Sequence, residues 1–173
     1  MEYENFTAKE IYQDMLDRIG QAYFDDDFDY IRRVIFVPHT FVTFESTYVM
    51  ETETDLRKMY DNLRVHFRSQ NIDTYHRVCH AAEFKSSTLI EGMHVTHMLS
   101  DVQQVEDSYP VRSFLKCVDN VWQVFCSDNA ITEDGWHSRA LKHAKKPNYF
   151  EQGANAHLRD LMHPPKQGEE TND

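Results

Sequence analysis

Residues 73–127 decide the fold of this chain. Four segments in this stretch mix β-branched, aromatic and polar residues in rough alternation: DTYHRVCHAAEFK (73–85), TLIEGMHVTHMLSD (88–101), YPVRSFLKCV (109–118) and VWQVFCS (121–127). Alternation predicts strands of a sheet with two different faces, because successive side chains point to opposite sides. The first two segments are longer than the usual strand of about 5–6 residues. Long antiparallel strands twist and curl, so we expect a curved sheet whose hollow side holds the functional site.

Two helices are predicted at the beginning of the chain. Thr7 and Glu10 have the spacing of a capping box, and apolar residues then recur at helical spacing to about Phe24. The acidic run at 25–27 suits the positive end of a second, short helix, DFDYIRRVI (27–35). The same acidic run is best explained as a helix cap and solvated surface, not as a metal site.

A strand pair and a third helix follow. Pro38 excludes helix, and residues 40–46 and 47–51 alternate as two strands. From about Thr54 the period returns to 3.6, with one apolar stripe: Leu56, Met59, Tyr60, Leu63 and Phe67. In the sheet that follows, Asp119 and Asn120 are predicted to form the tight turn of the last hairpin.

The last part of the chain has a different character. Residues 128–147 are polar without clear periodicity, and a short helix is expected around 150–161, ended by Pro164 and Pro165. We therefore expect an α+β domain at 1–130 and a C-terminal helical extension with a polar tail at 131–173.

Composition excludes several classes of function. The chain has 173 residues, 40% hydrophobic residues and a formal net charge of -11. That charge argues against binding of nucleic acid, where Lys and Arg supply most of the affinity. Without an 18-residue apolar run or a secretory signal, we expect a cytoplasmic protein with no membrane partner. Three cysteines at no metal-like spacing are expected to be reduced thiols.

The order of elements resembles the nuclear transport factor 2-like superfamily, which includes SnoaL-like proteins, ketosteroid isomerase and scytalone dehydratase. The resemblance covers roughly residues 7–130, and its most specific features are DFDYIRRVI (27–35) and FLKCVDNVWQV (114–124). It implies a cystatin-like cone, in which a curved, mainly antiparallel sheet wraps around the long N-terminal helix. It also implies an apolar pocket for a small molecule, no cofactor, and a homodimer through the convex face of the sheet.

Histidines are numerous in the predicted sheet. If Ser86 and Ser87 are the centre of an even-length turn, His97 lies opposite His76, and Met93 lies opposite His80. In an odd-length turn His94 lies opposite His80 instead. We favour the even register, because it gives one largely apolar face that we assign to the hollow: His76, Val78, His80, Ala82, Phe84, Leu89, Glu91, Met93, Val95 and His97.

A histidine pair in an apolar hollow suggests acid–base chemistry. Desolvation and mutual repulsion lower the proton affinity of neighbouring imidazoles, so one could act as a general base and the other could orient a substrate. The alternative is a pair of ordinary half-buried structural histidines. No metal is expected, because His76 and His80 lie roughly 13 Å apart along a strand and zinc–imidazole bonds are about 2.0–2.1 Å.

The resemblance to scytalone dehydratase implies a set of site residues. Its strand histidine falls on His76, its second histidine near His97, and its tyrosine on Tyr23. The chain departs from that pattern at three positions, where the family's aspartate, tyrosine and asparagine are replaced by Phe24, Phe44 and Val111.

Further ligand-binding candidates come from the assigned face and the third helix: His80, Glu91, Val78, Phe84, Met93 and Tyr60, with Phe44 and Val111 from the resemblance. Glu91 could point inward beside His80 or lie at the rim in water. Trp122, Phe114 and Val124 could form the dimer surface or pack under the C-terminal segment.

These observations lead to two main functional hypotheses. The first is a cofactor-independent dehydratase, isomerase or cyclase that acts on a small apolar carbonyl compound, with His76, His97 and Tyr23 as catalytic residues. The second is a non-catalytic ligand-binding or dimerisation module of the same fold.

Overall fold

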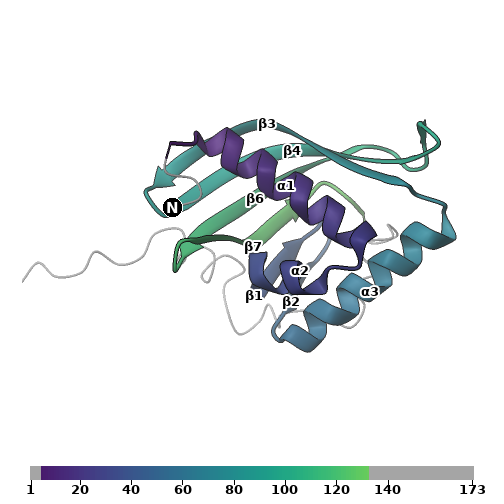
Figure 1. The fold of residues 1–173 in the computed structure, drawn as a ribbon, viewed down its shortest axis with the longest axis horizontal. Helices are drawn as coiled ribbons and strands as arrows, with labels where there is room; N and C mark the ends of the chain where they lie inside the picture. The colour runs from purple at the N-terminus through teal and green to yellow at the C-terminus, as the bar shows by residue number, and fades with distance from the viewer. Residues whose placement is uncertain (1–4, 133–173) are drawn as a thin grey trace, which may run out of the picture.

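A computed structural model of the chain describes residues 5–132 (Figure 1). The predicted C-terminal extension therefore lies outside the described residues. In chain order the elements are α1 (Ala8–Asp25), α2 (Phe28–Val34), β1 (Ile35–Val42), β2 (Thr47–Met50), α3 (Glu53–Ser69), β3 (Thr74–Ser86), β4 (Leu89–Ser100), β5 (Gln103–Gln104), β6 (Tyr109–Val118) and β7 (Val121–Asn129).

The strands form one mixed, mainly antiparallel sheet, as predicted. Its order is β2-β1-β7-β6-β4-β3, with β5 paired to β4, and only β1 and β7 run parallel within the described residues. The two predicted hairpins of the stretch 73–127 are both present. Asp119 and Asn120 form the last turn with φ values of 50° and 61°, the left-handed conformation that a two-residue hairpin loop requires.

The helices begin where the capping signals place them. Thr7 and Glu10 make the predicted capping box of α1, and Asp27 caps α2. Thr52 and Asp55 make a second capping box, at α3. Figure 1 shows α1 lying across one face of the sheet, with α2 and α3 beside its end. No helix in the described part of the chain is long and apolar enough to cross a membrane.

β1 begins earlier than the sequence predicts. Its first residue is Ile35, five positions before the expected start of the strand at residue 40. Pro38 lies inside the strand, where the pairing with β7 is interrupted between Ile35 and Thr40. A proline cannot donate a ladder hydrogen bond, so it is accommodated where the ladder is irregular.

The register of the β3–β4 hairpin matches the even prediction near His76 and departs from it further along. His76 pairs with His97, as expected. A bulge between Cys79 and Ala81 then places Met93 opposite Ala81, and the predicted pairing of Met93 with His80 is wrong. An extra residue at a bulge moves the following side chains to the other face of the sheet.

The face that packs on α1 is opposite to the one assigned from the sequence. Arg77, Cys79, His94 and Thr96 are buried on the inner face, whereas His76 is exposed. Gly92 lies on the inner face, and any side chain there would collide with the ring of Tyr12 on α1.

Candidate functional site

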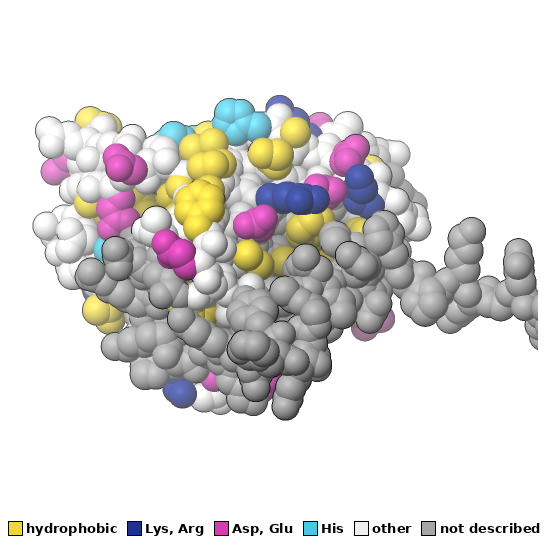
Figure 2. All heavy atoms as spheres, turned by 180° about the vertical axis from the view of Figure 1, so that it is seen from behind, with side chains coloured by type: hydrophobic (Ala, Val, Ile, Leu, Met, Phe, Trp, Pro, Cys, Tyr) yellow, Lys and Arg dark blue, Asp and Glu magenta, His cyan; other side chains and the backbone are white. Residues whose placement is uncertain are grey.

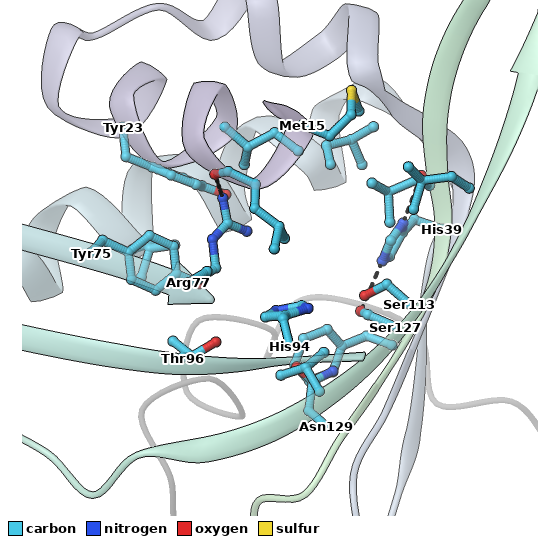
Figure 3. A pocket seen from close by; sticks show the side chains of 18 of the residues that line it. Met15, Tyr23, His39, Tyr75, Arg77, His94, Thr96, Ser113, Ser127 and Asn129 are labelled. Carbon is cyan, nitrogen blue, oxygen red and sulfur yellow. Dashed lines mark hydrogen bonds between the residues drawn. The ribbon is translucent and has the colours of Figure 1, made fainter. Parts of the chain in front are cut away.

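A cavity of about 110 Å³ lies between α1 and the inner face of the sheet (Figure 3). Most of its wall is apolar, with side chains from α1, β1, β6 and β7, such as Leu16, Phe41, Leu115 and Val124. A few polar side chains interrupt this wall: Tyr12, Tyr23, His39, Tyr75, Arg77, His94, Thr96, Tyr109, Ser113, Ser127 and Asn129. A mainly apolar pocket with a few polar groups is the usual form of a small-molecule site.

His94 is the imidazole of β4 in this wall. Its Nδ1 shares a hydrogen bond of 2.8 Å with the hydroxyl of Tyr12 on α1. Burial lowers the pKa of His94 to about 3, and the positive charge of Arg77 acts in the same direction. Burial also raises the pKa of Tyr12, so both groups are uncharged near neutral pH. Nε2 has no hydrogen-bond partner among the described residues, which leaves it available to a ligand.

His39 of β1 is held in a single tautomer. Its Nδ1 lies 3.2 Å from the carbonyl oxygen of Val124, which can only accept, so this nitrogen carries the proton. Burial lowers the pKa of His39 to about 4, and the ring is therefore neutral near pH 7. Nε2 then accepts a hydrogen bond from the hydroxyl of Ser127, at 3.2 Å. Figure 3 shows these hydrogen bonds at one end of the cavity.

Arg77 of β3 lies at the other end. Its Nη2 donates to the backbone carbonyl of Leu16, and its guanidinium carbon lies 4.8 Å from the centre of the Tyr75 ring. Three buried or half-buried tyrosines, Tyr23, Tyr75 and Tyr109, surround this end. Burial raises the pKa of Tyr23, whose hydroxyl donates to the sulfur of Met59 at 3.7 Å.

Two of the predicted site residues line this cavity, namely Tyr23 and Val111. Tyr60 is buried behind the wall, where its hydroxyl donates to the carbonyl of Ala22. Phe44 is 70% exposed in the loop after β1 and lies outside the cavity. Phe84 faces inward because of the bulge, but it lies at the tip of the hairpin against Trp122, with ring centres 6.2 Å apart.

The predicted histidine pair lies on the outer face of the sheet. The rings of His76 and His97 stack with centroids 6.3 Å apart, and Nδ1 of His97 shares a hydrogen bond of 2.7 Å with Ser108. The structure thus brings the two imidazoles together but turns them away from the cavity. Their predicted role as the base and the orienting group of a pocket has no support from this placement.

Four other predicted site residues of that face, Val78, His80, Glu91 and Met93, also lie on the outer side of the sheet, the side seen in Figure 2. Val78 is half-buried there, and His80 and Met93 are exposed. Glu91 forms an ion pair with Arg112 at 2.6 Å, which agrees with the rim alternative. Trp122 and Val124 are buried on the inner side, so of the three residues proposed for a dimer surface only Phe114 lies on the outer face.

The predicted site residues left out ten polar residues of the cavity wall: Tyr12, His39, Tyr75, Arg77, His94, Thr96, Tyr109, Ser113, Ser127 and Asn129. Of these only His94 was considered, through the odd-length turn that would place it opposite His80, and the structure pairs it with Cys79 instead. One signal was available on β6, where the alternating apolar residues Tyr109, Val111 and Leu115 indicate which face of that strand is buried. The residues of β4 that pair with them must lie on the same buried face. In that phase His94 pairs with Val111 and shares its face. Within residues 5–132, no group of three or more His, Cys, Asp and Glu side chains could hold a metal ion.

No protein-family model and no curated protein matches the chain. Solved structures do. A protein of unknown function from Mycobacterium tuberculosis is 10% identical, with a TM-score of 0.57 over 79% of this chain and 90% of that one. An NTF2-like protein with a cystatin-like fold from Novosphingobium aromaticivorans is 10% identical, with a TM-score of 0.53 over 78% of this chain and 88% of that one.

These likenesses define the fold class. The chain has the nuclear transport factor 2-like, or cystatin-like, α+β fold that its order of elements implied. At this level of identity the likeness concerns the fold alone, because one fold carries many unrelated functions.

Proposed function

We propose that the chain binds a small, mostly apolar molecule in the cavity between α1 and the sheet. The observation that carries this proposal is a cavity of about 110 Å³ whose apolar wall holds two neutral imidazoles, His39 and His94. Engineered apolar cavities of about 150 Å³ accept a benzene ring, so the ligand is about one ring in size. The free Nε2 of His94 would contact an oxygen-bearing group of that ligand.

A second candidate function is proton transfer on a small carbonyl compound, as in a cofactor-independent lyase or isomerase. The hydrogen bond between Tyr12 and His94 favours it, because it positions one imidazole against the cavity. The low basicity of His94 opposes it. An efficient general base has a pKa near the working pH, and the difference between about 3 and 7 corresponds to about 5 kcal/mol. We therefore place binding before catalysis.

Binding is tested with toluene and cyclohexanone as probes, by thermal unfolding and by NMR titration of the chain. We expect both probes to raise the midpoint of unfolding, because a ligand that binds only the native state stabilises it. Val111→Phe fills part of the cavity and is expected to weaken binding at least tenfold, whereas His76→Ala on the outer face changes nothing. A wild-type chain that binds neither probe would overturn the proposal.

Catalysis is tested with cyclohexanone in deuterated water, where proton abstraction next to the carbonyl exchanges hydrogen for deuterium. If the second candidate is right, the wild-type chain accelerates this exchange and His94→Gln does not. Binding of cyclohexanone without faster exchange would leave the first proposal in place and remove the second.

Two expectations from the sequence remain proposals about partners and location. We propose a homodimer through the outer face of the sheet, supported by exposed Met93 and half-buried Val78 and Val95. A cytoplasmic location is supported by three free thiols, Cys79, Cys117 and Cys126. The formal net charge of -11 argues against nucleic acid as a partner.

A further inference from the structure

Arg77 is a buried cation that has no acidic partner in the described part of the chain. Its side chain is only 9% exposed, although an arginine stays charged in proteins. Within the described residues its one hydrogen bond from the side chain goes to the carbonyl of Leu16, and Nε has no partner. The ring of Tyr75 provides a cation–π contact but no negative charge. A buried charge that lacks a counter-ion is costly, so its presence in a cavity wall points to a ligand.

Thr96 adds a second polar group at the same place. It pairs directly with Arg77 across the β3–β4 hairpin, and it is 1% exposed. Its Oγ1 has no well-formed hydrogen bond among residues 5–132, but the hydroxyl of Tyr109 lies beside it: burial raises the pKa of Tyr109, and the Thr96 hydroxyl opposes that shift. Both side chains line the cavity, and Figure 3 shows them at the same end, next to His94. A guanidinium and a hydroxyl therefore lie next to each other in the cavity wall.

The charge balance of the wall selects the ligand. No Asp or Glu lines the cavity, and both of its histidines are neutral near pH 7, so Arg77 provides the only full charge among the lining residues. A single guanidinium matches a monoanion, and its planar donors match the two oxygens of a carboxylate. The remaining wall is apolar and has room for about one ring or a short branched chain.

We propose that Arg77 and Thr96 bind the carboxylate of a small apolar monocarboxylic acid in this cavity. This inference rests on the proposed function, which it extends from a small molecule to an acid. The carboxylate lies against the guanidinium and the threonine hydroxyl, and the apolar body of the acid extends between α1 and β6. Nε2 of His94 is next to the same end, and in the tautomer in which the Tyr12 hydroxyl donates to Nδ1 it is a further donor to the carboxylate.

The test compares each acid with its neutral amide of the same shape: benzoate with benzamide, and isovalerate with isovaleramide. Affinities for the wild-type chain are measured near pH 7 by calorimetry or NMR titration. We expect each acid to bind about tenfold more tightly than its amide or better, because hydrogen bonds to charged groups are the stronger ones.

Substitutions test whether Arg77 and Thr96 are the residues that recognise the carboxylate. Arg77→Met is expected to weaken benzoate binding at least tenfold and to remove the preference for the acid. Arg112→Met is the matched control, because Arg112 is exposed on the outer face of β6, on the other side of β4 from β3. Thr96→Val keeps the shape of the side chain and removes its hydroxyl, so it should weaken the binding of the acid more than the binding of the amide. If Arg77→Met does not fold, the wild-type comparison and Thr96→Val still decide.

The outcomes separate this inference from the proposal beneath it. Equal affinity for acid and amide would overturn the carboxylate assignment and leave a small-molecule pocket in place. Preference for the acid that survives Arg77→Met would also overturn it, because the charge would then be recognised elsewhere. A chain that binds neither the acids nor toluene would overturn both.

Discussion

His39 and His94 are both kept neutral by burial. Each has a pKa below the ordinary value of 6.5, at about 4 and about 3. A histidine with a lowered folded pKa binds protons more readily in the unfolded chain. The contribution of the two neutral histidines to the free energy of unfolding is therefore fully present above about pH 6.5, and it is lost as the pH falls toward their folded pKa values.

This linkage predicts a measurable loss of stability in mild acid. Between pH 7 and pH 5, each of the two histidines should lower the free energy of unfolding by about 2 kcal/mol, from the difference between its folded and unfolded pKa values. Urea unfolding at both pH values measures this change. His39→Gln should reduce the pH dependence by about half, and His76→Gln, an exposed position, should not. A pH dependence unchanged in His39→Gln would contradict the argument.

The polar residues of the site were the hardest to predict, for a reason that lies in single side chains. Face assignment from sequence relies on the more apolar face being buried. Here the buried face of β3 and β4 carries Arg77, His94 and Thr96, while Val78, Val95 and Met93 lie outside. The wall of this cavity thus inverts the rule on which the prediction depends. Tyr23 and Val111, both named through the resemblance, line the cavity.

The contact between α1 and β4 depends on the absence of a side chain at Gly92. A Cβ atom there would overlap the ring of Tyr12. That tyrosine is fully buried, and its hydroxyl shares a hydrogen bond with His94. Gly92→Ala should therefore lower the free energy of unfolding by about 1–3 kcal/mol, the usual cost of overpacking. It should also change the chemical environment of His94. Both are measured by urea unfolding and by the NMR signals of the imidazole.

Val65→Ala is the control, since Val65 is 62% exposed on α3, away from the proposed dimer surface. We expect its unfolding free energy to stay within about 0.5 kcal/mol of the wild type. If Gly92→Ala were as stable as Val65→Ala, the packing of α1 on β4 would have to differ from the structure described.

At the level of helices and strands, sequence signals were sufficient where they were local. The capping box at Thr7, the aspartate cap at Asp27 and the turn at Asp119 and Asn120 all act within a few residues. The failures have non-local causes. The early part of β1 pairs in parallel with the distant β7. The bulge at His80 lies where side chains of α1, from Lys9 and Gln13, form hydrogen bonds with the backbone of β3. Neither partner is visible in the local sequence.

The packing of the sheet on α1 was implied by the resemblance of the order of elements to the nuclear transport factor 2-like fold. The oligomeric state is still a prediction. If a second copy covers the outer face, the chain should sediment at twice its mass of 20.5 kDa. Met93→Glu places a charge on that face and should shift the equilibrium toward monomer. Glu45→Gln, in the loop after β1, is a control on another surface. A monomeric wild-type chain would contradict the dimer.

The parallel pairing of β1 with β7 has a consequence for a chain that is still being synthesised. β7 is the last strand among residues 5–132, and it pairs with β1, which lies near the start of the chain, and with β6. This strand provides three residues of the cavity wall, Val124, Ser127 and Asn129. Contacts between such distant segments form late, because their loop closure must come first. A nascent polypeptide therefore has no compartment for a ligand until β7 has left the ribosome, and no ligand can assist its earlier folding.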